Sequence, residues 1–163
     1  EILLNELNKI KYYFLKKKKI KTEDILKLIN LAEDHSISEL IDNCLAKNNK
    51  KTINILNENN LSNEDCILIT RVFLNKSKKI YNLCSEFKRN NNIELTISSA
   101  RPPIFWKDKE IIKKQINQWT PENIKKLIFK LNEVELQIKK NIGNSVNLIT
   151  DFIIDQSISK TNN

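Results

Sequence analysis

Residues 120–140 read TPENIKKLIFKLNEVELQIKK, and they carry the strongest helix signals in the chain. Thr120 has a good N-cap side chain, Pro121 suits the first helical position, and Glu122 puts a carboxylate in the first turn. Apolar residues follow at helical spacing on one stripe, which consists of Ile124, Leu127, Ile128, Leu131, Val134 and Ile138. The stretch therefore predicts a long amphipathic helix that buries one face.

Similar periodicity predicts helices along most of the chain, and therefore an all-α fold. Ser36 followed by Glu39 predicts a capping box that opens one helix. Ser62 with Asp65 three residues later predicts the start of a long helix, which ends in the asparagines at 90–92.

Other segments complete the expected architecture. A short helix at 51–58 is expected to form an antiparallel hairpin with the long helix after it. Residues 93–99 alternate like a strand but have no second strand to pair with, so we expect an irregular segment or a single helical turn. Gly143 is expected to take the left-handed conformation that ends a helix. Further helices are expected at residues 3–14, 22–32 and 145–158.

Catalytic and metal-binding motifs are missing from the sequence. One glycine is too few for a P-loop or a dinucleotide-binding fingerprint, and the lone His35 leaves no histidine-based triad or zinc set. We therefore expect no catalytic residue, no metal and no cofactor. Cys44, Cys66 and Cys84 lie within apolar helical patterns, which favours buried thiols in a reducing, cytoplasmic compartment.

The ends and hydropathy of the chain give further expectations. No apolar run reaches the ~20 residues that cross a bilayer, so no membrane association is expected. The chain lacks methionine and begins inside an apolar helical pattern, so it is expected to be the C-terminal part of a longer protein.

The net charge of +8 has two interpretations. A basic helical module would bind nucleic acid through lysines on several helices. However, 25 of the 28 basic residues are lysine, and Lys, Asn and Ile supply 75 of the 163 positions, as AT-rich codons would produce at tolerant sites. Only Arg71, Arg89 and Arg101 offer the bidentate fork that suits bases and phosphates. Nucleic-acid binding is therefore the alternative function, not the first.

The most unusual segment is RPPIFWKDK at residues 101–109. Its two prolines block a helix and hold the backbone extended, and a helix is expected again from Asp108. Packing alone favours a corner between helices in which Phe105 and Trp106 fill the core. An interface role for the two rings is the alternative.

Several motifs occur in a fixed order: segments 5–9 and 20–25, RPPIFWK at 101–107, QWTPE at 118–122, and Leu131, Glu135 and Lys139 in the next helix. Together they resemble the delta subunit of the bacterial DNA polymerase III clamp loader, in an alphaproteobacterial-like form. The collar of a different clamp-loader subunit is a third option, and the proline–aromatic block favours delta over it. Ile142 departs from the family, since some relatives carry an aromatic ring there.

The resemblance implies a part in DNA replication. Residues 1–33 would be the end of a helical lid domain, and residues 34–163 would be a helical-bundle collar domain that assembles with gamma (or tau) and delta-prime subunits. In that family, ATP hydrolysis and DNA synthesis belong to other subunits of the holoenzyme. The sliding clamp is held by an N-terminal domain that this chain does not include, and primer–template DNA is reached through the assembled complex.

The resemblance also implies functional residues. Subunit contacts would fall on Arg101, Pro102, Pro103, Phe105, Trp106, Lys107 and Trp119. Proximity to DNA would fall on Lys139, Lys140 and Ile142.

Overall fold

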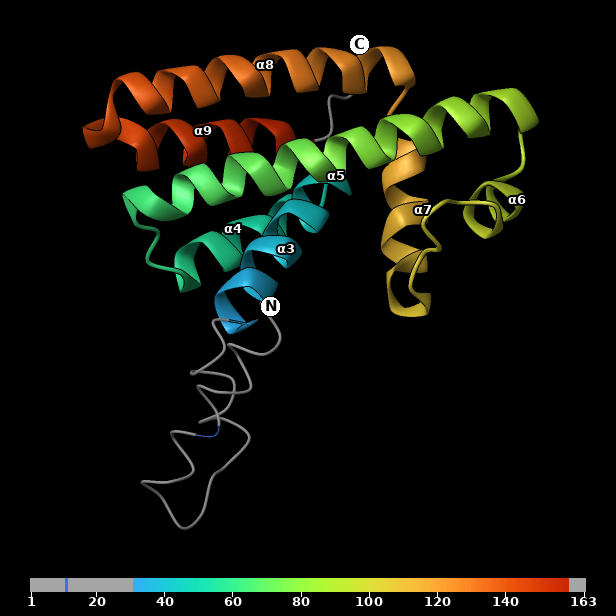
Figure 1. Ribbon diagram of the computed structural model, residues 1–163, viewed down its shortest axis with the longest axis horizontal. Helices are drawn as coiled ribbons and strands as arrows, with labels where there is room; N and C mark the ends of the chain where they lie inside the picture. Colours follow the sequence, from blue (N-terminus) through green and yellow to red (C-terminus); the bar gives the residue numbers. More distant parts are fainter. Residues whose placement is uncertain (1–10, 12–30, 159–163) are drawn as a thin grey trace. The chain divides into compact units, whose positions relative to one another are not determined.

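The structure is a computed structural model that describes residue 11 and residues 31–158 (Figure 1). The chain divides into two compact units, Glu1–Ile37 and Ser38–Asn163. The described residues form seven α-helices, two short 3-10 helices and no strand, so the all-α prediction is confirmed. The helices expected at 3–14 and 22–32 lie almost entirely outside the described residues, and the expected domain limit after residue 33 stays a prediction.

Helix α5 (Asn63–Asn90) is the longest element, and most of the other helices pack on it. Its predicted capping box is confirmed, because the Ser62 hydroxyl accepts a hydrogen bond from the Asp65 N–H and the Asp65 carboxylate accepts one from the Ser62 N–H. Asn91 adopts a left-handed φ of 50° and ends the helix, as the asparagine run predicted.

Helix α8 (Pro121–Lys140) packs along α5 and runs in the opposite direction (Figure 1). The Thr120 hydroxyl accepts a hydrogen bond from the Asn123 N–H, which confirms the predicted N-cap. The predicted apolar stripe faces inward, and its fully buried members are Ile124, Leu127, Leu131 and Ile138. Their burial provides much of the hydrophobic free energy that holds α8 on the domain.

The remaining helices flank this pair. Helix α9 (Ser145–Ser157) packs on α4 (Asn49–Glu58), α5 and α8. Helices α6 (Ile93–Ser98) and α7 (Lys109–Gln118) pack on the C-terminal part of α5 (Figure 1). Of the two outcomes expected for residues 93–99, an irregular segment or a single helical turn, the structure has the helical one, the short helix α6. Among the described helices, none combines the length and apolarity needed to cross a membrane.

The predicted helix start at Ser36 is wrong, because α3 (Leu31–Leu45) already begins five residues earlier. A Ser-x-x-Glu pattern marks a helix start only where the preceding residues leave the helical conformation. No proline or glycine precedes Ser36 here to force that change.

Two other local expectations are also wrong. Gly143 has no positive φ and lies in a 3-10 helix (Ile142–Asn144). The C-cap of α8 is Asn141 instead, with φ −138° and ψ 79°. The expected hairpin partner of α4 was α5, yet α4 packs chiefly on α9. The apolar side chains of α4 are thus buried by a helix that follows about ninety residues later in the sequence.

Candidate functional site

The proline–aromatic block, residues 101–107, forms the surface corner between α6 and α7. The Arg101–Pro102 peptide bond is cis. Ile104 turns inward and is 7% exposed, whereas Phe105 is 57% exposed and Trp106 is 67% exposed. The expectation that the two rings fill the core is therefore wrong. At this corner only the Ile104 side chain packs inward, and both aromatic rings stay on the surface.

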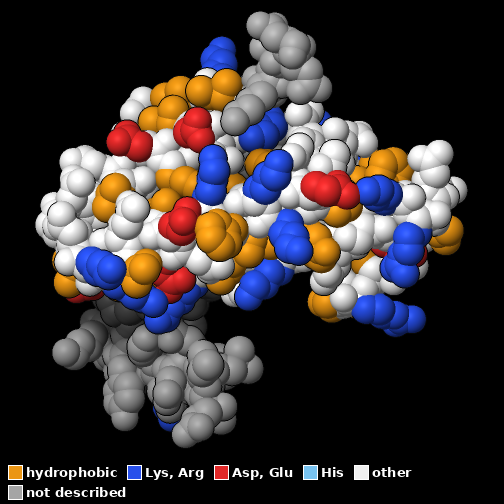
Figure 2. Space-filling view, turned by 90° about the horizontal axis from the view of Figure 1, so that it is seen from above, with side chains coloured by type: hydrophobic (Ala, Val, Ile, Leu, Met, Phe, Trp, Pro, Cys, Tyr) orange, Lys and Arg blue, Asp and Glu red, His pale blue; other side chains and the backbone are white. Residues whose placement is uncertain are grey.

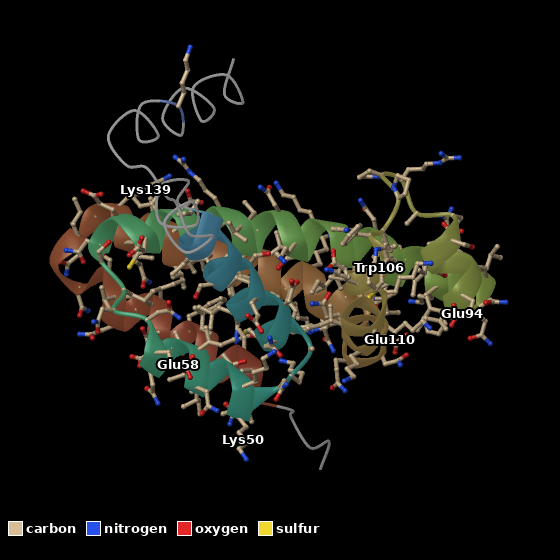
Figure 3. The ribbon with its side chains drawn as sticks, turned by 90° about the horizontal axis from the view of Figure 1, so that it is seen from below. Lys50, Glu58, Glu94, Trp106, Glu110 and Lys139 are labelled. Carbon is tan, nitrogen blue, oxygen red and sulfur yellow. The ribbon has the colours of Figure 1, made fainter. Side chains whose placement is uncertain are left out.

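The two exposed rings form a small ordered cluster. Their centroids are 5.7 Å apart with the planes tilted by 48°, and the Lys107 ammonium lies 5.3 Å from the centre of the Trp106 ring. Figure 3 shows where Trp106 lies on the molecule. Arg101, Pro102 and Pro103 are exposed beside the rings. Exposed aromatic groups next to cations are typical of contact sites, where tryptophan and arginine carry much of the binding energy.

Trp119 lies in a different environment from this cluster. Its indole N–H donates a hydrogen bond to the carbonyl of Leu45 at 2.7 Å, and its ring is half-buried. The ammonium of Lys47 lies 4.1 Å from the centre of the ring and also donates a hydrogen bond to the carbonyl of Gln156. Trp119 therefore ties the start of α8 to the end of α3, and its polar edge is used inside the domain.

The residues expected near DNA gather at the C-terminal end of α8. Lys139 forms an ion pair with Glu135 one turn earlier, with 2.7 Å between nitrogen and oxygen. Lys140 is exposed, and Ile142 is exposed in the 3-10 helix that follows. Their roles stay predictions, as do the subunit contacts expected for the block and for Trp119.

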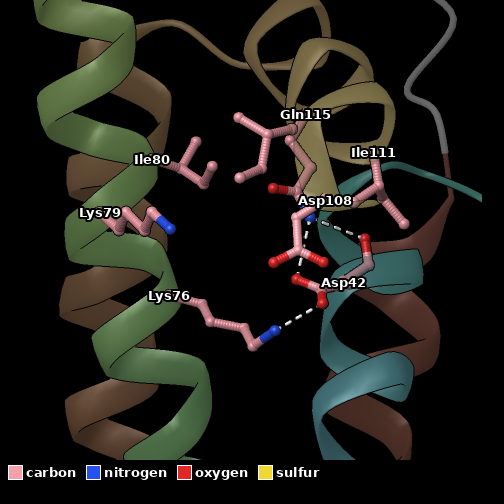
Figure 4. A pocket seen from close by; sticks show the side chains of 8 residues that line it. Asp42, Lys76, Lys79, Ile80, Asp108, Ile111 and Gln115 are labelled. Atoms are coloured by element: carbon pink, nitrogen blue, oxygen red, sulfur yellow. Dashed lines mark hydrogen bonds and ion pairs between the residues drawn. The ribbon is translucent and has the colours of Figure 1, made fainter. Parts of the chain in front are cut away.

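A pocket between α3, α5 and α7, lined by both charged and apolar side chains, was not predicted from the sequence (Figure 4). Its volume is about 120 Å³. The buried amide of Gln115 donates hydrogen bonds to the backbone carbonyl and the carboxylate of Asp42, at 2.9 and 3.3 Å. Lys76 pairs with the same carboxylate at 2.5 Å. These contacts neutralise Asp42 and join three helices, which indicates a structural role for the pocket.

The surroundings of the three cysteines do not favour reactive thiols. All three are free and buried, which confirms the prediction of buried thiols. Burial raises the pKa of Cys44 to about 12 and that of Cys84 to about 11, so both stay protonated at neutral pH. Within the described residues, no group of three or more His, Cys, Asp and Glu side chains could hold a metal ion.

Comparison of the chain with models of protein families, with curated proteins and with solved structures finds no match.

Proposed function

We propose that this chain is the C-terminal part of a bacterial clamp-loader delta subunit. In this role, residues 34–163 assemble with gamma (or tau) and delta-prime subunits in the collar of the complex that loads the sliding clamp onto DNA. The order of motifs along the sequence supports the proposal, and an all-helical domain is compatible with it.

The observation that carries the proposal is the exposure of Phe105 and Trp106. Two adjacent aromatic rings on the surface expose a large apolar area to water, which is unfavourable. A partner that covers the rings removes this unfavourable hydration free energy. The buried Ile104 side chain anchors the segment from below. The rings are thus presented on a fixed corner and not on a long loop, which lowers the entropy lost on binding.

The test is assembly with purified gamma (or tau) and delta-prime, followed by size-exclusion chromatography with light scattering. We expect a defined heteromer, and we expect Phe105→Ala and Trp106→Ala each to weaken it about tenfold or more. Leu68→Ala is the matched control, because Leu68 is an exposed apolar residue (37%) on α5, outside the block. Absence of a heteromer, or equal weakening by Leu68→Ala, would refute the proposal.

The alternative function, a basic helical module that binds nucleic acid, rests on the net charge of +8. Several of its lysines are already engaged with carboxylates, in the pairs Lys51–Glu39, Lys76–Asp42, Lys88–Glu122, Lys113–Glu94 and Lys139–Glu135. Tight DNA binding by the isolated chain, with a steep dependence on salt, would favour this alternative. Weak binding that is lost by ~0.2 M salt would indicate that the net charge reflects codon bias and not a nucleic-acid-binding function.

A further inference from the structure

The outer face of α8 exposes two large apolar side chains that play no part in the core. Phe129 is 66% exposed and Leu136 is 54% exposed. They are seven residues apart, which places them two turns apart on one line, about 10 Å along the helix axis. Figure 2 looks onto this side of the molecule, where hydrophobic side chains lie among lysine and arginine side chains.

The charges around these two residues are mostly positive. By helical spacing, Lys125, Lys126 and Lys140 share the face with Phe129 and Leu136, and all three are exposed. Within the part of the chain that the structure describes, none of the three lysines lies within 4.0 Å of a carboxylate oxygen.

The acidic residues of the same face do not balance these lysines. The carboxylate of Glu122 is already paired with Lys88 of α5, at 2.6 Å. Only Glu133 remains between the two apolar side chains. We call the set of Lys125, Lys126, Phe129, Glu133, Leu136 and Lys140 the α8 outer face. It combines two apolar anchors with a net positive charge.

The chemistry of this face selects among ligands. A membrane-bound helix needs a broad apolar face, and here the apolar line is one residue wide and is interrupted by Glu133. Single-stranded nucleic acid binds on stacked aromatic rings, and Leu136 offers none. A second helix fits better, because an apolar side chain of that helix can pack between anchors two turns apart while carboxylates beside it meet the lysines.

We propose that the α8 outer face binds an acidic amphipathic helix of a partner protein. An apolar side chain of that helix packs between Phe129 and Leu136, and its flanking carboxylates pair with Lys125, Lys126 and Lys140. This surface is separate from the proline–aromatic block, since α8 packs chiefly on α5 and α9 whereas the block joins α6 to α7. The proposal therefore goes beyond collar assembly and does not depend on it.

The test uses the full 163-residue chain and a fluorescently labelled peptide of about three heptads, in which leucine occupies the a and d positions and glutamate the flanking positions. Fluorescence anisotropy measures binding, and circular dichroism follows the helix that the peptide gains. A second peptide with lysine in place of every glutamate is the charge control. Phe129→Ala and Leu136→Ala are the test variants, and Leu95→Ala, at an exposed apolar position (51%) on α6, is the matched control variant.

We expect the acidic peptide to bind with a Kd in the range of about 10–100 μM, and we expect each test variant to weaken binding about tenfold. Leu95→Ala should leave binding unchanged, and the lysine peptide should bind at least tenfold more weakly. Exposed positions such as Phe129 tolerate substitution without unfolding. Equal binding of the two peptides, or no loss in Phe129→Ala, would overturn the proposal. Absence of acidic-peptide binding up to ~1 mM would also overturn the proposal, whether or not the chain binds anionic vesicles in a separate assay.

Discussion

The contact of Trp119 with the end of α3 leads to a quantitative prediction about stability. Replacement of Trp119 by Phe keeps an aromatic ring but removes the indole N–H that donates to the Leu45 carbonyl at 2.7 Å. Leu45 is fully buried, so its carbonyl loses a partner that water cannot easily replace. Such a loss costs about 1–3 kcal/mol. The smaller ring also weakens the contact with the Lys47 ammonium, by about 0.5 kcal/mol.

Together these losses lower the free energy of unfolding by about 2 kcal/mol in Trp119→Phe. The assay is urea unfolding followed by far-UV circular dichroism, which does not depend on tryptophan fluorescence. With a urea dependence of about 2 kcal/mol per molar, the midpoint should fall by about 1 M. A parallel decrease in the melting temperature is expected.

Trp106→Phe is the matched control for this experiment. Trp106 is exposed, and its aromatic contacts are with Phe105 and Lys107 at the surface. The same substitution there should change stability by less than about 0.5 kcal/mol. The reasoning is refuted when the midpoint of Trp119→Phe lies within about 0.2 M of the wild-type value, or when the two variants lose equal stability.

Three further predictions concern local features. Thr120→Ala should cost about 1 kcal/mol by removing the cap of α8, while Thr120→Ser should retain most of it; urea unfolding of both variants checks this. Gly143→Ala should raise the free energy of unfolding by about 0.5 kcal/mol, and the melting temperature with it, because the φ of Gly143 is not positive and an added Cβ would lie 3.9 Å from the Asn141 side chain. A loss of stability in this variant would contradict the 3-10 geometry. The raised pKa of Cys44, about 12 against a usual 9.0, means that the unfolded chain releases the thiol proton first. Stability should therefore fall as pH rises above 9, by about 1 kcal/mol at pH 10, and Cys44→Ala should show a smaller fall in urea unfolding at pH 8 and pH 10.

Local signals explain which elements were predictable from the sequence. The caps at Ser62 and Thr120 and the stripe of α8 depend on residues within one or two turns, and the structure confirms them. Ser36 and Gly143 also carry strong local signals, but each signal has two structural outcomes. Serine is tolerated inside a helix that its neighbours extend, and glycine adopts negative φ values as readily as positive ones.

Contacts between distant residues were not predictable from one sequence. The Trp119–Leu45 hydrogen bond joins residues 74 positions apart, and the Gln115–Asp42 hydrogen bonds join residues 73 positions apart. Periodicity identifies which face of a helix is buried but not which helix covers it. The assignment of α4 to α5 failed for this reason, because a short connection in sequence does not require adjacent packing.

The two exposed aromatic sites differ in how far sequence could have identified them. Phe129 and Leu136 fall outside the buried stripe of α8, so their exposure follows from the sequence once that stripe is known. Phe105 and Trp106 lie in a segment without periodicity, where nothing in the sequence shows whether the rings or Ile104 turn inward. The block lies between α6 and α7, whereas Phe129 lies on α8. Loss of subunit assembly in Trp106→Ala and loss of peptide binding in Phe129→Ala should therefore occur independently. A variant that abolished both activities would instead indicate a general effect on folding, and circular dichroism would reveal it.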